Sequence, residues 1–286
     1  MAVARVRTPH RRMAVAAGLV ALAAVCACTR TASSGATSPN RPARSVPVDK
    51  SSKPKQHTRT APKPAHRAPA RPIRRHHATK HLSPLVTGPS LSYGSTGAAV
   101  TAVQTRLNSL GYWVGSPSGY FGDTTLQAIY ALQKASGIGR DGVLGPRTRR
   151  ALVAGILPRP RPSKGHVVQV DLAKDLVMFT TNGHLNYVLN TSTGGGYTYS
   201  DQGGTFVAET PIGVFHIYSQ INGLVTDSLG QLWMPKYFTG GFAIHGDGYV
   251  PPIPVSHGCV RVSNEAIQWI WSANLAPMGA EVWVYS

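Results

Sequence analysis

The chain has 286 residues, of which 42% are hydrophobic, and a formal net charge of +18. Residues 1–90 hold 17 of the 29 Lys and Arg residues but only one acid, Asp49, so residues 91–286 are nearly neutral. The positive charge belongs to a segment with too few large apolar residues to form a core. The high charge is therefore no evidence of a folded nucleic-acid-binding domain.

Residues 1–28 have the pattern of an export signal. Four Arg residues precede an apolar run from Met13 to Cys28, which is too short for a comfortable membrane span. Val25-Cys26-Ala27-Cys28 has the shape of a lipoprotein cleavage box, so we expect Cys28 to become a lipidated N-terminus. Ordinary signal cleavage nearby, with release from the membrane, is the alternative. Either outcome places the protein outside the cytoplasm and makes nucleic acid an unexpected partner.

Residues 29–89 are predicted to be a disordered basic linker. They are rich in Pro, Ser, Thr, Lys and Arg and cannot bury a core. Such a segment serves either as a spacer or as a tether to anionic polymers or lipid head groups.

Residues 90–157 are predicted to form a small domain of three helices. Apolar residues recur at helical spacing in the first helix, at Val100, Val103, Leu107 and Leu110, and the second carries Leu126, Ile129 and Leu132. The third helix is expected from Arg147 to Ala154, after the turn at 141–146. Asp123 or Thr124 is the expected cap of the second helix. The glycines, the Leu-Gly-Tyr at 110–112 and the two similar turns at 119–123 and 141–146 resemble the peptidoglycan-binding three-helix module.

Residues 165–286 are predicted to be mostly β with one clear helix. β-Branched runs favour strands, and Asn182-Gly183 favours a hairpin turn between two of them. The expected strands are Val167–Val170, Leu176–Thr180, Leu185–Thr191, residues 210–218 and Glu281–Ser286, with a Gly- and Tyr-rich loop at Gly194–Gly204. Ser263 or Asn264 is expected to cap the helix.

Cys259 is the only cysteine after residue 28, and it follows His257 and Gly258. A second histidine, His245, lies 14 residues upstream. A thiol and a nearby imidazole form the minimal set for nucleophilic acyl transfer. A small buried thiol between packed strands is the alternative. His245, Asp247, His257 and Cys259 include types that bind zinc, but no H-x-x-x-H or C-x-x-C spacing is present, so we expect no metal and no cofactor.

The segments Ile244-His245-Gly246 and Ser256-His257-Gly258-Cys259-Val260-Arg261 resemble the signature of the L,D-transpeptidases of bacterial cell walls. Thr210-Pro211-Ile212-Gly213-Val214-Phe215-His216-Ile217 is similar to a second element of that family. Some members carry Asn two residues after the cysteine, where this chain has Arg261. The resemblance implies a mostly-β, sandwich-like catalytic domain with one main helix.

The resemblance also implies a reaction. The cysteine takes the acyl group of a tetrapeptide stem, releases D-Ala, and passes the acyl group to the amine of a neighbouring stem in a 3→3 cross-link. Transfer to water would make the enzyme an L,D-carboxypeptidase instead, and a non-catalytic wall-binding protein is a more remote alternative. The partners are then peptidoglycan stem peptides, with anionic wall polymers as the expected contact of the basic linker.

Roles for individual residues follow from the same resemblance. It implies that His245 is the base and that the Gly246 carbonyl orients it. His257 shapes the pocket or supports the oxyanion region, although a residue two positions from Cys259 on an extended chain can also face the thiol. Gly258 permits a tight backbone that aims the Cys259 N–H at the oxyanion.

Three further residues have two readings each. Arg261 grips a substrate carboxylate or forms a structural ion pair. Tyr237 donates to the oxyanion or forms an aromatic wall. Ser256 is expected to be a hydrogen-bonding brace rather than a nucleophile.

Overall fold

The structure, a computed structural model, describes residues 83–286. The predicted export signal, Cys28 and most of the predicted linker lie outside the described residues. The described residues belong to one compact unit. None of the helices in this part of the chain is long and apolar enough to cross a membrane.

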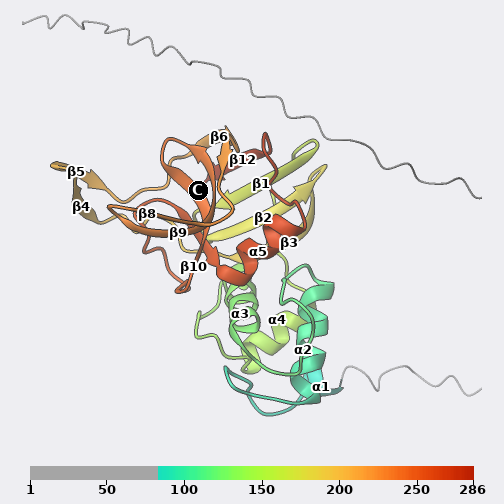
Figure 1. Ribbon diagram of the computed structural model, residues 1–286. Coiled ribbons are helices and arrows are strands. Elements are labelled where there is room, and N and C mark those ends of the chain that lie inside the picture. The colour runs from blue at the N-terminus through green and yellow to red at the C-terminus, as the bar shows by residue number, and fades with distance from the viewer. Residues whose placement is uncertain (1–82) are drawn as a thin grey trace, which may run out of the picture. The chain divides into compact units, whose positions relative to one another are not determined.

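The helical region contains the three predicted helices and a short extra one (Figure 1). Their bounds are α1 Ser83–Val86, α2 Ala98–Ser109, α3 Asp123–Ser136 and α4 Pro146–Ala154. The predicted cap of α3 differs, because Gly122 occupies the cap position and no side chain caps the helix. Asp123 instead lies in the first turn, where its charge interacts favourably with the helix dipole.

The helical region also begins earlier than residue 90. Leu85 in α1 is 6% exposed and belongs to the same core as α2, α3 and α4. Its carbonyl accepts a hydrogen bond from Nη1 of Arg149 at 3.4 Å. The segment that composition assigned to the linker therefore ends in α1, which packs on the other helices through Leu85. A four-residue helix is too short to show a periodic apolar pattern.

The C-terminal region is mostly β, as predicted, with two five-stranded sheets and one two-stranded sheet. The first sheet has the order β3-β2-β1-β12-β6, and the second has the order β11-β10-β9-β7 with β8 paired to β9. The bounds are β1 His166–Asp171, β2 Leu176–Thr181, β3 His184–Asn190, β6 Gly213–His216, β12 Glu281–Tyr285, β7 Ser219–Gln220, β8 Leu224–Asp227, β9 Gly230–Thr239, β10 Phe242–Asp247 and β11 Val260–Ser263. The main helix, α5, spans Asn264–Ser272, and the Ser263 hydroxyl caps it by accepting from the Ala266 N–H at 3.2 Å.

The predicted loop at Gly194–Gly204 instead contains most of a two-stranded hairpin, which Figure 1 shows projecting from the sheets. Its strands are β4, Thr198–Asp201, and β5, Gly204–Val207. Gln202 and Gly203 both have positive φ, 45° and 80°, as a tight two-residue hairpin turn requires. The predicted strand at residues 210–218 is shorter and is reduced to β6.

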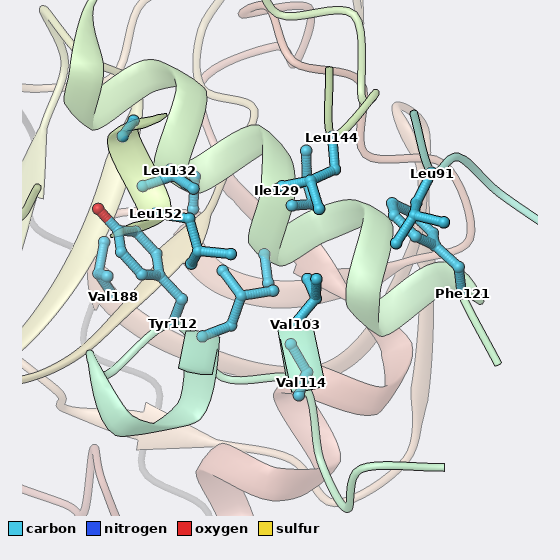
Figure 2. Packing of buried hydrophobic residues seen from close by; sticks show 14 of the residues in the cluster. Leu91, Val103, Tyr112, Val114, Phe121, Ile129, Leu132, Leu144, Leu152 and Val188 are labelled. Atoms are coloured by element: carbon cyan, nitrogen blue, oxygen red, sulfur yellow. The ribbon is translucent and has the colours of Figure 1, made fainter. Parts of the chain in front are cut away.

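Two hydrophobic cores meet in strand β2. Val177 and Phe179 face the core between the two sheets, whereas Leu176 and Met178 belong to the core of the helical region. This alternation is the period of a strand that is buried on both faces. Figure 2 shows Val188 of β3 beside Tyr112 and Leu152 in that second core. The helical region therefore shares its core with the first sheet.

We predict that Met178→Ala will lower the free energy of unfolding by about 2–5 kcal/mol, because it opens a cavity in a close-packed core. Met178 is 0% exposed in the core shared by helices and sheet. Val214→Ala is the control, since Val214 is 60% exposed and its change should stay within about 0.5 kcal/mol. Denaturant unfolding followed by tryptophan fluorescence and by circular dichroism measures both variants. A loss below about 1 kcal/mol for Met178→Ala would contradict the shared core.

Candidate active site

Cys259 immediately precedes strand β11, and its side chain is half-buried. Gly258 before it has a φ of 134°, a conformation that L side chains rarely adopt. A Cβ atom on Gly258 would lie 2.4 Å from a ring carbon of Phe242 and 2.6 Å from the carbonyl oxygen of Glu209. The backbone before the thiol therefore follows a path that only glycine permits.

Two hydroxyl groups bind the backbone of the turn at Gly258 and Cys259. Oγ of Ser256 accepts from the Gly258 N–H at 3.0 Å and donates to the Cys259 carbonyl at 2.6 Å. Oγ1 of Thr210 donates to the Gly258 carbonyl at 2.7 Å and accepts from the Gly194 N–H at 3.0 Å. The Ser256 hydroxyl is thus engaged with the backbone of the turn that carries the thiol.

His245 lies in β10 and is 3% exposed. Its Nδ1 atom is 2.9 Å from the carbonyl oxygen of Gly246. Because a carbonyl only accepts, Nδ1 of the neutral ring carries the proton and Nε2 keeps its lone pair. The ring therefore presents its basic nitrogen away from Gly246.

The parallel pairing of β10 with β11 places His245 opposite Arg261 and Ile244 opposite Val260. Side chains two positions apart on an extended segment share one face, so Cys259 lies on the same side as Arg261 and His245. All three line one cavity of about 790 Å³. Segments that are separate in sequence thus deliver the thiol and the imidazole to one space.

Burial shifts the pKa values of Cys259 and His245 in opposite directions. It raises the pKa of the Cys259 thiol, and an Ala243 backbone hydrogen bond and the charge of Arg261 offset this only in part. It lowers the pKa of His245, although the Gly246 carbonyl and Asp247 act in the other direction. Both shifts favour a resting pair of neutral thiol and neutral imidazole over a thiolate–imidazolium pair.

Arg261 forms an ion pair at the edge of the cavity. Its Nε atom lies 3.2 Å from Oδ2 of Asp247, and the two side chains are 21% and 23% exposed. The ion pair is therefore present, and both residues also line the cavity. A role for Arg261 in holding a substrate carboxylate stays a prediction.

The other two predicted residues, His257 and Tyr237, come from different segments of the chain. The ring of His257 packs edge-on against Tyr199 at 4.6 Å and Tyr197 at 5.5 Å between ring centroids. Tyr237 lies in β9 opposite Ala243. Burial raises the pKa of Tyr237, and the charge of Cys259 raises it further, so the two groups are close. Tyr237 is not among the residues that line the cavity, whereas His257 is.

Sequence reasoning missed the parts of the site that come from two hairpins. Tyr199, Asp201 and Phe206 of the β4–β5 hairpin line the cavity, and so does Asp227 at the end of β8. Aromatic residues around the Gly203-Gly204 turn are a hairpin signal that could have been read. The placement of either hairpin over the thiol depends on tertiary structure and has no local signal.

Within residues 83–286, no group of three or more His, Cys, Asp or Glu side chains could hold a metal ion. The cavity is lined by the Cys259 thiol, two imidazoles, the Arg261–Asp247 pair and two further carboxylates, those of Asp201 and Asp227.

Two family descriptions match the chain. Residues 96–152 match a putative peptidoglycan binding domain, and residues 165–284 match the L,D-transpeptidase catalytic domain. Among curated proteins, the chain is 39% identical over 79 residues to the N-acetylmuramoyl-L-alanine amidase CwlL of Bacillus licheniformis, which is 27% of this chain and 22% of that protein. It is 39% identical over 56 residues to the amidase CwlM of Mycobacterium tuberculosis, or 20% of this chain and 14% of that protein. The chain thus spans less than a quarter of the length of either amidase.

A solved structure covers more of the molecule. The L,D-transpeptidase of Xylanimonas cellulosilytica is 45% identical, with a TM-score of 0.67, and the match covers 70% of this chain and 98% of that one. Its extent takes in both the helical region and the region that carries Cys259 and His245. By this similarity and by the family match over residues 165–284, the chain belongs to the L,D-transpeptidase family.

Proposed function

We propose that the protein is a peptidoglycan L,D-transpeptidase with Cys259 as nucleophile and His245 as general base. The observation that carries the proposal is the shared cavity, into which β10 delivers the imidazole and the turn before β11 delivers the thiol. Membership of the family supports the substrate class, a tetrapeptide stem of the cell wall. The similarity of the helical region to a putative peptidoglycan binding domain supports the same polymer as its ligand.

The first half of the reaction is acylation. Nε2 of His245 takes the thiol proton as Sγ of Cys259 attacks the carbonyl that joins the diamino acid to D-Ala. The S–C bond forms, the C–N bond breaks, and the imidazolium returns its proton to the leaving amine of D-Ala. In this mechanism the Cys259 N–H donates to the developing oxyanion, a role supported by the glycine-only backbone at Gly258.

The second half is acyl transfer. The side-chain amine of a neighbouring stem attacks the thioester, His245 takes its proton, and the S–C bond breaks to regenerate the thiol. The product is a 3→3 cross-link. Arg261 and His257, which line the cavity, position the stem.

We further propose that the protein acts from the outer face of the cell membrane. A lipidated Cys28 would hold it there, and the basic linker would extend across anionic wall polymers. The extracytoplasmic location is supported by the two domain matches and by the similarity to wall amidases.

Replacing the nucleophile tests the proposal directly. Cys259→Ala should lower D-Ala release and 3→3 dimer formation at least about 1,000-fold, because no other group in the cavity can form the thioester. Mass spectrometry of wall fragments after incubation measures both products. Circular dichroism shows whether the variant is folded. Retained cross-linking by the folded variant would exclude the thiol mechanism, and D-Ala release without dimers from the wild type would make the enzyme a carboxypeptidase.

The pH profile tests the assignment of the base. Because burial lowers the pKa of His245, its neutral form persists to lower pH. The acidic limb of kcat/KM for D-Ala release should therefore fall below pH ~6.5, the usual histidine value. His257→Gln, measured with the same stem peptide, should keep that limb. An acidic limb above pH ~6.5, or one that disappears in His257→Gln alone, would contradict the assignment.

The anchor is tested by fractionation. The wild-type protein should stay in the membrane fraction after washing with high salt, because acyl chains bind hydrophobically whereas the charge of the linker is screened within about 10 Å. Cys28→Ala should appear in the medium with unchanged activity per molecule. A wild-type protein that is soluble, with an unmodified N-terminus away from Cys28, would remove the membrane anchor.

A further inference from the structure

Lys134 is a buried cation of the helical region that the proposed mechanism does not use. It lies in the last turn of α3, and its side chain is 0% exposed. Its Nζ atom donates to Oδ2 of Asp175 at 2.8 Å, to the Asp175 carbonyl at 2.9 Å and to the Thr191 carbonyl at 2.7 Å. An ammonium group has three protons, and all three are bound by residues of the first sheet and its adjoining segment.

Asp175 also binds the segment that follows β3. It lies in the turn between β1 and β2 with a φ of 58°. Its Oδ1 atom accepts from both the N–H and the hydroxyl of Thr193, at 3.1 Å and 2.8 Å. One carboxylate therefore binds the Lys134 ammonium through one oxygen and Thr193 through the other.

The segment at residues 191–193 is hydrogen-bonded to residues before and after Cys259. The Thr193 carbonyl accepts from the Ser256 N–H at 2.9 Å, just before the thiol turn. Ser192 exchanges two backbone hydrogen bonds of 3.1 Å with Arg261, just after it. The hydroxyl of Thr191 adds a third bond to the Arg261 carbonyl at 2.7 Å.

Ser256 links this segment to the thiol turn, because its hydroxyl binds both the Gly258 N–H and the Cys259 carbonyl. We propose that Lys134 is a positioning residue for Cys259, acting through Asp175, Thr193 and Ser256. The inference rests on the proposed function. It assigns to the peptidoglycan-binding-type region a part in setting the geometry of the catalytic thiol, in addition to any binding of glycan.

Burial and charge fit this role. Burial lowers the pKa of Lys134 to about 8, Asp175 opposes that shift, and Arg140 adds to it. The ammonium therefore keeps its charge at neutral pH. A buried ion pair is costly to form, but it specifies one geometry once its hydrogen bonds are complete, as they are here.

Two variants each break a different link of the hydrogen-bonded series that runs from Lys134 to Ser256. Lys134→Met removes the cation, and Thr193→Val removes only the hydroxyl link while leaving the ion pair in place. We expect kcat for D-Ala release to fall about 10-fold or more in Lys134→Met, since a misplacement of about 1 Å can cost 100-fold. KM should change by less than about twofold, because the cavity lining is unchanged. Thr193→Val should show a smaller loss of kcat in the same direction.

Met178→Ala is the matched control. Met178 lies in the core that the helices share with the first sheet, and none of the hydrogen bonds that link Lys134 to the thiol turn involves its side chain. All variants are assayed in the full chain at a temperature at which circular dichroism shows them folded. Met178→Ala should keep its kcat. Equal losses in Met178→Ala and Lys134→Met, or unchanged kcat in both Lys134→Met and Thr193→Val, would overturn the proposal.

A second readout does not depend on transpeptidation. The rate of Cys259 alkylation by iodoacetamide and the backbone amide resonances of Ser256, Gly258 and Cys259 report the geometry of the turn. Both should change in Lys134→Met and stay as in the wild type in Met178→Ala. If the wild type releases no D-Ala, the proposed function fails, while these measurements still decide whether Lys134 positions the thiol. Unchanged alkylation and resonances in a folded Lys134→Met variant would refute it.

Discussion

Parallel pairing of β10 with β11 determines which side chains share the cavity. The pairing sets His245 beside Arg261, and it starts one residue after Cys259. Parallel strands need a connection long enough to return to the same end of the sheet. Here residues 248–259 provide it, and they end in the turn that Gly258 makes possible. The catalytic geometry is thus a consequence of strand register combined with one backbone conformation.

The register alone does not hold the turn in place. A strand edge next to an irregular loop leaves backbone groups that must find partners. In this chain the segment at residues 191–193 supplies partners before and after Cys259, and the hydroxyls of Ser256 and Thr210 bind further backbone groups of the turn. The helical region and the first sheet share a core, so the thiol turn rests on contacts that extend well beyond the second sheet.

Much of this arrangement could be predicted from the sequence. Apolar residues at helical positions predicted α2 and α3, and the turn at residues 141–146 indicated where α4 begins. Of the two expected caps of α5, Ser263 and Asn264, the structure has Ser263. The family motif alone predicts that Cys259 and His245 lie in one site. The β4–β5 hairpin was mistaken for a loop, because its glycines and polar residues obscured a short alternating pattern. The early start at α1 had too few residues to be recognised.

Lys134 could not have been found in the same way. A lysine near the end of a helix ordinarily reads as a solvated side chain that complements the dipole. Its burial depends on Asp175, 41 residues away, and on Thr191, 57 residues away. Propensity and periodicity describe neighbours along the chain, so contacts of this range stay invisible to them. The roles of the individual site residues likewise depend on their relative placement.

The β4–β5 hairpin separates the shape of the cavity wall from the stability of the fold. Among the described residues, none of the hairpin belongs to either hydrophobic core, and its strands pair only with each other. Its tip nevertheless lines the cavity, and Tyr199 packs on His257. Substitutions there alter the wall of the cavity at little cost to folding. Side chains that the hairpin contributes to the cavity wall can therefore be replaced without opening a cavity in either core.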